Sequence, residues 1–450
     1  MQTFSKQTRF EHSLEKLFQW HEKPEAFALL TPPWTPIRLQ KTEGPGGIVP
    51  GTVHDLKIGL LRIPWKAKHT EYQKNSLFTD EQISGPFQTF IHRHEFESSA
   101  PSESILRDSI SYQTHLGIPL PLIQSELNRV FTYRHKKTQI CLDRLDTFKG
   151  PSGKILVSGG TGFIGVQLRL ALAQLGHEVY NLTRNPVHAN DIHWNWEKKE
   201  IGQLPQPLKC VIHLAGENIA SDIWNEKLKN AISRSRVEGT KFLADSLRLQ
   251  NAVPRTFLCA SAIGIYGDRD EEILEEPSLP GTSFLANLGV KWEQQTEKLQ
   301  DLETRICNLR FGMVLDSRGG ALSKMFWPFV MGLGGRLGHG KQYMSFIGLE
   351  DVINSILFLM TQPGAKGPFN LVSPSPITNS DFTKVLAKVL KRPTFLHLPE
   401  KALRLTLGEM ADELFLCSQR VVPSRLLNAG YQFLHPDLES ILRYSLGREQ

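Results

Sequence analysis

A glycine-rich turn is the segment whose residue types and spacing best suit the binding of a phosphate group. It reads Ser158-Gly-Gly-Thr-Gly-Phe-Ile-Gly165 and joins the apolar run Ile155-Leu-Val157 to a helical pattern at residues 166–175. Glycine lets the backbone turn tightly and approach a pyrophosphate, and the helix N-terminus offers N–H groups and partial positive charge. We expect a dinucleotide to bind here; a turn without a ligand is the alternative. The residues expected to contribute are Gly159, Thr161, Gly162, Phe163, Ile164 and Gly165.

The end of the next strand indicates which dinucleotide binds. In an NAD site an acidic residue about 20 residues beyond the glycines accepts hydrogen bonds from the ribose. Here the strand ends Asn181-Leu-Thr183-Arg184, without an acid. Because an arginine can pair with the 2′-phosphate of NADP, Thr183 and Arg184 favour NADP(H) over NAD. An arginine that is merely hydrated at a strand end is the alternative.

Length and composition place these motifs in a multidomain globular protein. A chain of 450 residues has room for about three domains. The 52 basic and 46 acidic residues give a net charge of +6, but the basic residues form no cluster, so we expect no nucleic-acid partner. The five cysteines lie far apart without zinc-ligand spacing, which is typical of a reducing cytoplasm. We recognise no signal peptide and no apolar run of membrane-spanning length, and therefore expect no membrane partner.

The pattern of apolar runs changes at Gly150-Pro-Ser-Gly153, which we interpret as a domain boundary. Residues 1–150 contain short strand-like segments between Gly and Pro turns, with candidate helices at residues 14–21 and 123–137. Residues 153–365 alternate apolar runs with helix-length segments, which predicts an α/β fold with a doubly wound parallel sheet of the Rossmann type. Residues 366–450 predict a small helical C-terminal lobe.

Six further motifs follow the glycine turn in order along the chain. They are His213-Leu-Ala-Gly-Glu-Asn218, Ser235-Arg-Val-Glu-Gly-Thr240, Ser261-Ala-Ile-Gly-Ile-Tyr-Gly-Asp268, Leu309-Arg-Phe-Gly-Met-Val-Leu315, Gly338-His-Gly-Lys-Gln342 and Gly367-Pro-Phe-Asn-Leu-Val-Ser-Pro374. With the glycine turn they resemble the atypical short-chain dehydrogenase/reductases termed sugar-nucleotide epimerase-like proteins, over about residues 153–445. We expect further cofactor contacts from Leu214, Ala215, Gly216, Glu217 and Arg310.

The resemblance also shows where this chain departs from typical catalytic residues. Short-chain reductases commonly use a Tyr-x-x-x-Lys pair and a serine to move a proton while the cofactor moves a hydride. Alignment on Trp292-Glu293 puts Leu285 and Gly289 at the Tyr and Lys positions. The remaining catalytic candidates are Ser261 and Tyr266, with Glu217 nearby; a structural turn at Tyr266 and helix capping by Glu217 are the alternatives.

The first 150 residues resemble, more weakly, the helix-grip domains of the polyketide-cyclase and lipid-transfer superfamily. The segments that carry this resemblance include Leu29-Leu-Thr-Pro-Pro-Trp34, Phe78-Thr-Asp80, His92-Arg-His94 and Asp108-Ser-Ile-Ser-Tyr112. The resemblance implies a curved sheet around a long helix and a cavity for an apolar ligand. Trp34, Trp65, Phe87 and Phe90 are candidate cavity walls, although simple core packing would also account for them.

His92 and His94 lie two residues apart, so they share one sheet face if residues 90–96 form a strand. The pair could bind a metal, but the sequence shows no obvious third ligand, and we therefore expect none. The sequence as a whole predicts an NADP(H)-binding oxidoreductase or epimerase-like enzyme acting on an unidentified small-molecule substrate. Because the Tyr-x-x-x-Lys pair is missing, a non-enzymatic NADP(H)-binding sensor or ligand-presenting protein is the alternative.

Overall fold

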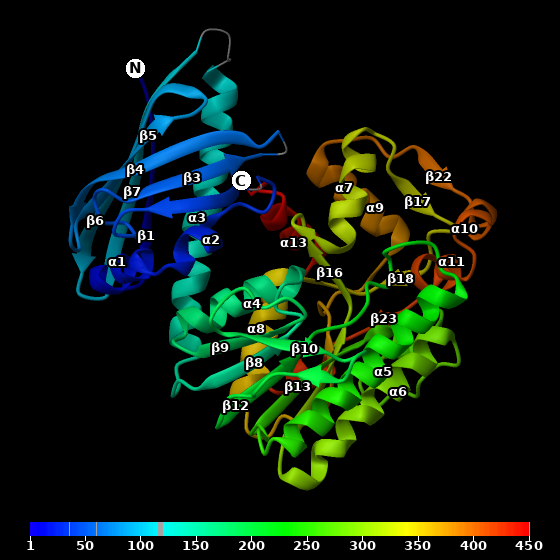
Figure 1. The fold of residues 1–450 in the computed structure, drawn as a ribbon. Coiled ribbons are helices and arrows are strands. Elements are labelled where there is room, and N and C mark those ends of the chain that lie inside the picture. The colour runs from blue at the N-terminus through cyan, green and yellow to red at the C-terminus, as the bar shows by residue number, and fades with distance from the viewer. Residues whose placement is uncertain (36, 60, 116–119, 450) are drawn as a thin grey trace. The chain divides into compact units, whose positions relative to one another are not determined.

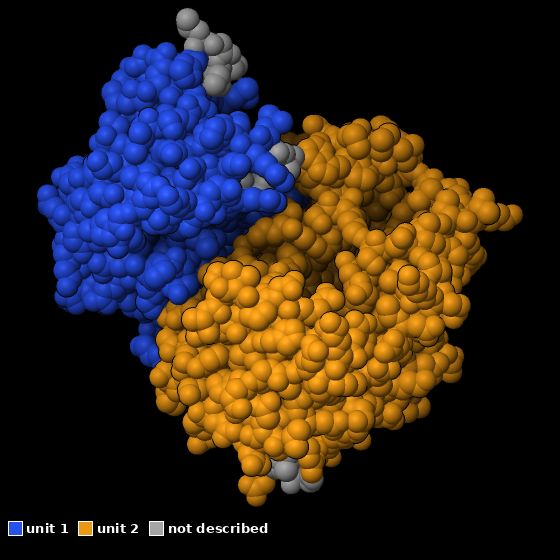
Figure 2. Space-filling model, in the orientation of Figure 1, with its two compact units in different colours: residues 1–149, 444–450 blue, residues 150–443 orange. Residues whose placement is uncertain are grey.

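The structure is a computed structural model that describes residues 1–35, 37–59, 61–115 and 120–449. Within it the chain divides into two compact units, which Figure 2 shows in different colours. Unit 1 comprises residues 1–149 together with residues 444–450, and unit 2 comprises residues 150–443. The division therefore falls at the Gly-Pro-Ser-Gly segment that the sequence analysis identified.

Unit 1 is built on a seven-stranded sheet (Figure 1), in the order β1-β7-β6-β5-β4-β3-β2. Neighbouring strands are antiparallel, and the first strand of the chain pairs with the last strand of the sheet. Burial alternates along β6 and β7 because successive side chains point to opposite faces. The strands are β1 (Gln2–Phe10), β2 (Ile37–Glu43), β3 (Val53–Ile58), β4 (Ile63–Gln73), β5 (Leu77–Ser84), β6 (Phe87–Ala100) and β7 (Glu103–Thr114).

Helices α1 (Leu14–Glu22) and α2 (Glu25–Leu30) connect β1 to β2, and the long helix α3 (Leu120–Thr147) follows the sheet. Phe131 of α3 packs against Phe90 and Tyr112 of the sheet. Of the candidate cavity walls, Trp65, Phe87 and Phe90 contact one another, whereas Trp34 packs elsewhere, against Tyr133. The antiparallel sheet with a long helix is thus observed, and the helix-grip assignment and the apolar ligand stay predictions.

The segment at residues 444–450 belongs to unit 1 although it follows the whole of unit 2. Tyr444 packs with Tyr133 and Ile140 of α3. Arg129 of α3 donates hydrogen bonds to the carbonyl oxygens of Leu446 and Gly447, at 2.6 and 3.2 Å. Residues from both extremes of the described chain therefore contribute to one core.

Unit 2 is built on an eight-stranded sheet in the order β11-β10-β9-β8-β12-β13-β15-β20. All neighbouring pairs are parallel except β10 with β11, which confirms the predicted parallel α/β sheet. Its inner strands are almost wholly buried, as expected for a sheet covered on both faces. The strands are β8 (Lys154–Ser158), β9 (Glu178–Thr183), β10 (Asp191–Asn195), β11 (Glu200–Ile201), β12 (Leu208–His213), β13 (Thr256–Ala262), β15 (Arg305–Phe311) and β20 (Gly367–Leu371).

Helices cover both faces of this sheet (Figure 1), with α4 and α8 on one face and α5 and α6 on the other. This arrangement follows from right-handed crossovers that leave the central strands in opposite directions. These helices are α4 (Phe163–Gln174), α5 (Glu226–Leu249), α6 (Phe284–Thr296) and α8 (Leu349–Thr361).

Shorter elements complete unit 2. Its short strands are β14 (Ile273–Leu274), β16 (Met313–Asp316), β17 (Gly335–Leu337), β18 (Tyr343–Met344), β19 (Phe346–Gly348), β21 (Ile377–Thr378), β22 (Leu396–Leu398) and β23 (Arg420–Val421). Its remaining helices are η1 (Ile263–Tyr266), η2 (Glu297–Leu302), α7 (Gly320–Val330), α9 (Asn379–Leu390), α10 (Glu400–Leu407), α11 (Glu409–Ala411), η3 (Asp412–Leu416) and α12 (Ser424–Asn428), and α13 (Leu438–Ser445) ends in unit 1. None of the described helices has the length and apolar character needed to cross a membrane.

Candidate cofactor site

The glycine turn lies at the carboxyl edge of the unit 2 sheet, where the order of the strands reverses. From β8 the chain passes through α4 to β9 on one side, and from β12 it passes through α5 to β13 on the other. Open α/β sheets bind ligands in the crevice outside the strand ends at such a point. The topology therefore places the predicted cofactor residues where a ligand can reach them.

Backbone packing explains why glycine occupies the turn. Gly159 has a φ of +71°, a conformation that favours glycine, and a Cβ there would lie 2.9 Å from the backbone nitrogen of Ala215. A Cβ at Gly165 would lie 2.6 Å from the Cα of Gly160, so that α4 could not start so close to the turn. The turn is thus held tightly between two strand ends.

Gly162 is the N-cap residue of α4, and it is exposed. Among the described residues no side chain caps this helix, whereas Asn225 and Ser283 cap α5 and α6 by accepting hydrogen bonds from first-turn N–H groups. The first-turn N–H groups of α4 can therefore donate to a bound phosphate. The turn fits the pyrophosphate of a dinucleotide, with Thr161 exposed beside Gly162 and Phe163 and Ile164 half-buried behind it.

A chain of buried polar groups supports the turn from below. Ser158 Oγ lies 2.5 Å from His213 Nδ1, and His213 Nε2 lies 3.0 Å from Thr240 Oγ1, which also accepts from the indole of Trp292. Burial lowers the pKa of His213 to about 4, so the ring is neutral at physiological pH. A neutral ring can donate with one nitrogen and accept with the other, which suits its two hydroxyl partners.

The loop after β12 is fixed to the glycine turn by hydrogen bonds. The backbone N–H of Leu214 donates to the carbonyl oxygen of Ser158 at 3.1 Å, and that of Ala215 donates to Ser158 Oγ at 3.3 Å. The N–H of Glu217 donates to Ser235 Oγ at 3.0 Å, while the Glu217 carboxylate is exposed. Leu214 and Ala215 therefore lie beside the turn, and the predicted cofactor contacts of Leu214 through Glu217 stay predictions.

At the end of β9, Thr183 is half-buried and Arg184 is exposed. Thr183 Oγ1 accepts a hydrogen bond from the backbone N–H of Asn185 at 3.3 Å. Arg184 forms no ion pair with any described residue, so its guanidinium can pair with an incoming anion. Because β9 is the sheet neighbour of β8, the structure brings Arg184 and the glycine turn to the same edge.

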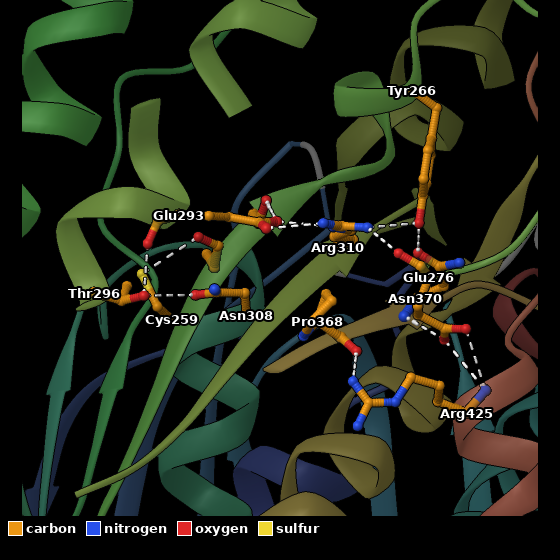
Figure 3. Close-up of polar contacts among 12 residues, drawn as sticks. Cys259, Tyr266, Glu276, Glu293, Thr296, Asn308, Arg310, Pro368, Asn370 and Arg425 are labelled. Atoms are coloured by element: carbon orange, nitrogen blue, oxygen red, sulfur yellow. Dashed lines mark hydrogen bonds and ion pairs between the residues drawn. The ribbon is translucent and has the colours of Figure 1, made fainter. Parts of the chain in front are cut away.

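Arg310 is the predicted cofactor residue that the structure places apart from this cluster. Its strand, β15, is separated from β8 by β12 and β13. Arg310 is only 8% exposed, and its guanidinium binds the Glu293 carboxylate through Nε and Nη2 at 2.8 and 2.9 Å (Figure 3). Its Nη1 donates to the Tyr266 hydroxyl and to the carbonyl oxygen of Glu276, both at 2.9 Å. The donors of Arg310 are therefore engaged inside unit 2.

The two catalytic candidates belong to this same network, in which Figure 3 shows Tyr266. Tyr266 is wholly buried; its hydroxyl accepts from Arg310 and donates to Asn370 Oδ1 at 2.8 Å, and burial raises the pKa of the phenol. Ser261 is 2% exposed and donates to Glu293 Oε1 at 2.6 Å. The structure thus brings Ser261, Tyr266 and Arg310 together but gives each of them internal partners. Their roles in catalysis stay predictions.

The positions aligned with the Tyr and Lys of typical reductases lie on α6. Leu285 is half-buried, and a Cβ added at Gly264 of η1 would lie 3.3 Å from its Cβ. A Cβ at Gly289 would lie 2.9 Å from the Cβ of Ile265. A lysine at Gly289 would therefore require α6 to move away from η1.

Sequence reasoning missed three members of the network, Glu293, Glu276 and Asn370. The Glu276 carboxylate accepts from the backbone N–H of Asn370 at 3.0 Å, and Asn370 Nδ2 donates to the carbonyl oxygen of Val422. Glu293 served only as an alignment landmark in the sequence. No local signal marked Glu293, because a glutamate on a helix is usually solvated and its pairing with Arg310 is a tertiary contact.

Comparisons with known proteins agree with this geometry. The model of the NAD dependent epimerase/dehydratase family matches residues 155–372, and that of a domain of unknown function, DUF1731, matches residues 398–444. An epimerase family protein of Mycobacterium bovis is 39% identical over 296 residues, which are 65% of this chain and 98% of that protein. The chain belongs to the epimerase family. A Staphylococcus aureus member of this family is 34% identical and is matched over 97% of its length.

Two solved structures of the epimerase family extend the comparison. The nucleoside-diphosphate sugar epimerase from Corynebacterium glutamicum matches with a TM-score of 0.83 and 29% identity, over 99% of this chain and 91% of that one. The human epimerase family protein SDR39U1, solved with NADPH, matches with a TM-score of 0.60 and 31% identity, over 64% of this chain and 98% of that one. The first similarity spans nearly the whole chain and so includes unit 1, whereas the second spans 64% of it.

Proposed function

We propose that this epimerase family protein binds NADP(H) at the carboxyl edge of β8, β9 and β12. The observation that carries the proposal is the exposed, uncapped N-terminus of α4 at Gly162, which can donate N–H groups to a pyrophosphate. Gly159 and Gly165 hold the turn close to Ala215, so that the phosphate-binding backbone is rigid before the ligand arrives. The family supports a nicotinamide dinucleotide as the ligand.

We assign the preference for NADP(H) to Arg184. It is exposed, has no ionic partner among the described residues, and follows a strand that ends without an acid. The human relative was solved with NADPH, which supports the phosphorylated cofactor. A charge-assisted pair between the guanidinium and the 2′-phosphate contributes on the order of 2 kcal/mol.

The proposed reaction is an oxidoreduction or epimerisation of a small substrate. When bound, the nicotinamide supplies hydride transfer. The relative from Corynebacterium glutamicum is a nucleoside-diphosphate sugar epimerase, which supports testing that substrate class first. Among the predicted site residues, Glu217 offers a solvent-exposed carboxylate that can hold or release a proton. Ser261 can move a proton only along its hydrogen bond to Glu293.

A non-enzymatic NADP(H) sensor is the second candidate, and two observations favour it. The close approach of α6 to η1 leaves no room for a lysine at Gly289, and Tyr266 is not accessible to a substrate. Such a protein would keep the cofactor cradle and change its interactions with the redox state of the nucleotide. The two candidates share the same cofactor site and differ only in turnover.

Calorimetric titration of the full chain with NADPH and NADH tests the cofactor site. Gly162→Val should abolish NADPH binding, because its side chain stands where the pyrophosphate approaches. Gly364→Val is the matched control, since a Cβ at Gly364 meets nothing within 4 Å. Unchanged NADPH affinity in a folded Gly162→Val variant contradicts the proposal.

The preference for NADP(H) is tested with Arg184→Ala and the control Arg255→Ala, an exposed arginine at the amino end of β13. Arg184→Ala should lower NADPH affinity by about 30-fold and leave NADH affinity unchanged. Arg255→Ala should change neither. An intact NADPH-to-NADH affinity ratio in Arg184→Ala refutes the assignment.

Turnover separates the two candidates. The full chain is incubated with NADPH or NADP⁺ and a panel of nucleoside-diphosphate sugars and small carbonyl compounds. Nicotinamide absorbance reports net oxidoreduction, and NMR of the sugars reports epimerisation without net change of the cofactor. Product formation that Gly162→Val removes supports the enzyme, while NADPH binding without any product across the panel favours the sensor.

A further inference from the structure

Unit 1 buries a cluster of three histidines and two aspartates in its core. The pairing of β5 with β6 puts Asp80 opposite His92, and the pairing of β6 with β7 puts His94 opposite Asp108. His135 reaches the same cluster from α3, where its Nε2 lies 2.6 Å from Asp108 Oδ2. All five side chains therefore meet at one site formed by three strands and a helix.

Asp108 binds one ring nitrogen of each strand histidine. Its Oδ1 lies 2.9 Å from His92 Nε2 and 2.7 Å from His94 Nδ1. The contact of His92 is a hydrogen bond, whereas His94 Nδ1 comes close to Asp108 without hydrogen-bond geometry. In the neutral tautomer in which His92 Nε2 donates to Asp108, its Nδ1 holds a lone pair.

The other nitrogens of both rings point to Asp80. His92 Nδ1 lies 3.3 Å from Asp80 Oδ2, and His94 Nε2 lies 3.5 Å from the same oxygen. Both separations exceed the usual 2.7–3.2 Å range of N–H to oxygen hydrogen bonds. Two ring nitrogens and a carboxylate oxygen thus face one another, an arrangement that suits a cation bound by all three atoms.

The separations fit the edges of a metal coordination polyhedron. Bonds from Zn²⁺ of about 2.0–2.2 Å to nitrogen and oxygen place tetrahedral ligands about 3.3 Å apart. The ligand atoms offered by Asp80, His92 and His94 all lie within 4.8 Å of one another. Asp108 and His135 would lie behind the ligands, because Asp108 is hydrogen-bonded to both His92 and His135. Histidine ligands commonly donate their second N–H to a carboxylate that is itself hydrogen-bonded.

Burial makes the demand for positive charge strong. The side chains of His92 and Asp108 are 5% and 4% exposed, and that of Asp80 is 23% exposed, which leaves solvent one side of approach. Arg134 of α3 adds a further positive charge near both aspartates.

We propose that Asp80, His92 and His94 bind a divalent transition-metal ion of the Zn²⁺ type in unit 1. The ligands are Asp80 Oδ2, His92 Nδ1 and His94 Nε2, and Asp108 orients the His92 ring through a hydrogen bond. Three protein ligands leave a coordination position for water or an oxygen-containing ligand. The sequence analysis expected no metal because it recognised only the histidine pair; the strand pairing supplies Asp80.

Metal content of the untagged full chain provides the first test. The protein is treated with a chelator, dialysed against Zn²⁺ or Co²⁺, and freed of loosely bound ions by gel filtration. We expect a single Zn²⁺ per chain by mass spectrometry, and visible ligand-field bands of a four- or five-coordinate site with Co²⁺. A folded wild-type chain that retains no metal and shows no such bands overturns the proposal.

Variants then identify the ligands. Asp80→Asn and His94→Gln should each weaken Zn²⁺ binding by more than about 100-fold, and Asp108→Asn by about 10–100-fold. His69→Asn is the matched control, because His69 is a buried histidine that pairs with Asp80 across β4 and β5 but is not one of the ligands. Loss of metal in His69→Asn, or its full retention in both Asp80→Asn and His94→Gln, overturns the ligand assignment.

Folding is monitored separately for each variant. NADPH binding, which depends on unit 2, and far-UV circular dichroism should match the wild type in Asp80→Asn and His94→Gln. Wild-type metal binding remains a test by itself if any variant fails to fold. Because the metal site and the cofactor site use different residues, failure of one proposal leaves the other standing.

Discussion

The buried polar cluster of unit 2 and that of unit 1 differ in how their donors and acceptors are matched. In unit 2 the guanidinium of Arg310 faces the Glu293 carboxylate, the Tyr266 hydroxyl and a backbone carbonyl oxygen, all between 2.8 and 2.9 Å. In unit 1 two histidine nitrogens face the oxygen of Asp80 at 3.3 and 3.5 Å. A saturated cluster stabilises the fold, whereas an unsaturated one indicates a ligand.

Two buried histidines show the same contrast. His213 in unit 2 lies between the hydroxyls of Ser158 and Thr240, and burial lowers its pKa to about 4. His92 in unit 1 lies between the carboxylates of Asp80 and Asp108, which raise its pKa to about 9 against the effect of burial. The identity of the facing group, and not burial alone, decides the charge of a buried histidine.

The largest effect should come from breaking the saturated cluster. Glu293→Leu leaves the Arg310 charge buried without its carboxylate, and should lower the free energy of unfolding by about 3–5 kcal/mol. Asp245→Ala, which removes an exposed pair with Lys241, should cost less than about 1 kcal/mol. Chemical denaturation of both variants checks this. A loss below 1 kcal/mol in Glu293→Leu would mean that the network contributes little.

The next largest loss of stability should come from crowding the close packing of α6 on η1. Gly289→Ala adds a Cβ 2.9 Å from that of Ile265 and should destabilise unit 2 by about 1–3 kcal/mol. Gly364→Ala, which meets no neighbour, is the control. The same crowding predicts that Leu285→Tyr with Gly289→Lys produces no catalytic activity. Turnover by that double variant would show that α6 can move away from η1.

The neutral state of His213 predicts a pH dependence. The pKa of His213 is about 4 in the folded chain and 6.5 in the unfolded one. Between these pH values the unfolded chain binds a proton at His213 and the folded chain does not. The free energy of unfolding should therefore fall by about 2 kcal/mol from this group between pH 7 and pH 5. His213→Asn should flatten the pH profile by that amount, and the exposed His193→Asn should not. Parallel profiles for wild type and His213→Asn contradict the prediction.

The smallest expected effect on stability comes from removing the Tyr266 hydroxyl. This change also distinguishes a structural role of Tyr266 from a catalytic one. Tyr266→Phe removes one acceptor of Arg310 and one donor to Asn370, and should cost about 1 kcal/mol of stability because the ion pair with Glu293 remains. If Tyr266 serves only the network, NADPH affinity and turnover should stay at the wild-type level. A collapse of turnover with unchanged NADPH affinity would instead identify Tyr266 as a catalytic residue.

Local patterns in the sequence were sufficient to predict the glycine turn and the strand and helix that flank it. The glycine turn, the apolar strand before it and the helix after it lie within about one βα unit, and their spacing reflects direct steric limits. The parallel sheet followed from the alternation of apolar runs with helices, and it is confirmed. The loop at Leu214 was found because it follows the strand that pairs with β8.

The polar clusters could not be read from the sequence because their members come from distant segments. Tyr266 reaches Asn370 across 104 positions, and His135 reaches Asp108 from a different element. Such contacts depend on strand register, and a shift of one residue would move Asp80 to the opposite face of its sheet. Sequence patterns contain the residue types but not the register that brings them together.

The placement of residues 444–450 in unit 1 has a consequence for how the chain is made. The sheet and α3 leave the ribosome first, but the backbone carbonyls that Arg129 binds and the ring that packs on Tyr133 follow only after unit 2. At about 5–20 residues per second, that interval lasts on the order of tens of seconds. During this time the face of α3 that later holds Tyr444 is uncovered, so the core of unit 1 is completed only after unit 2 has been synthesised.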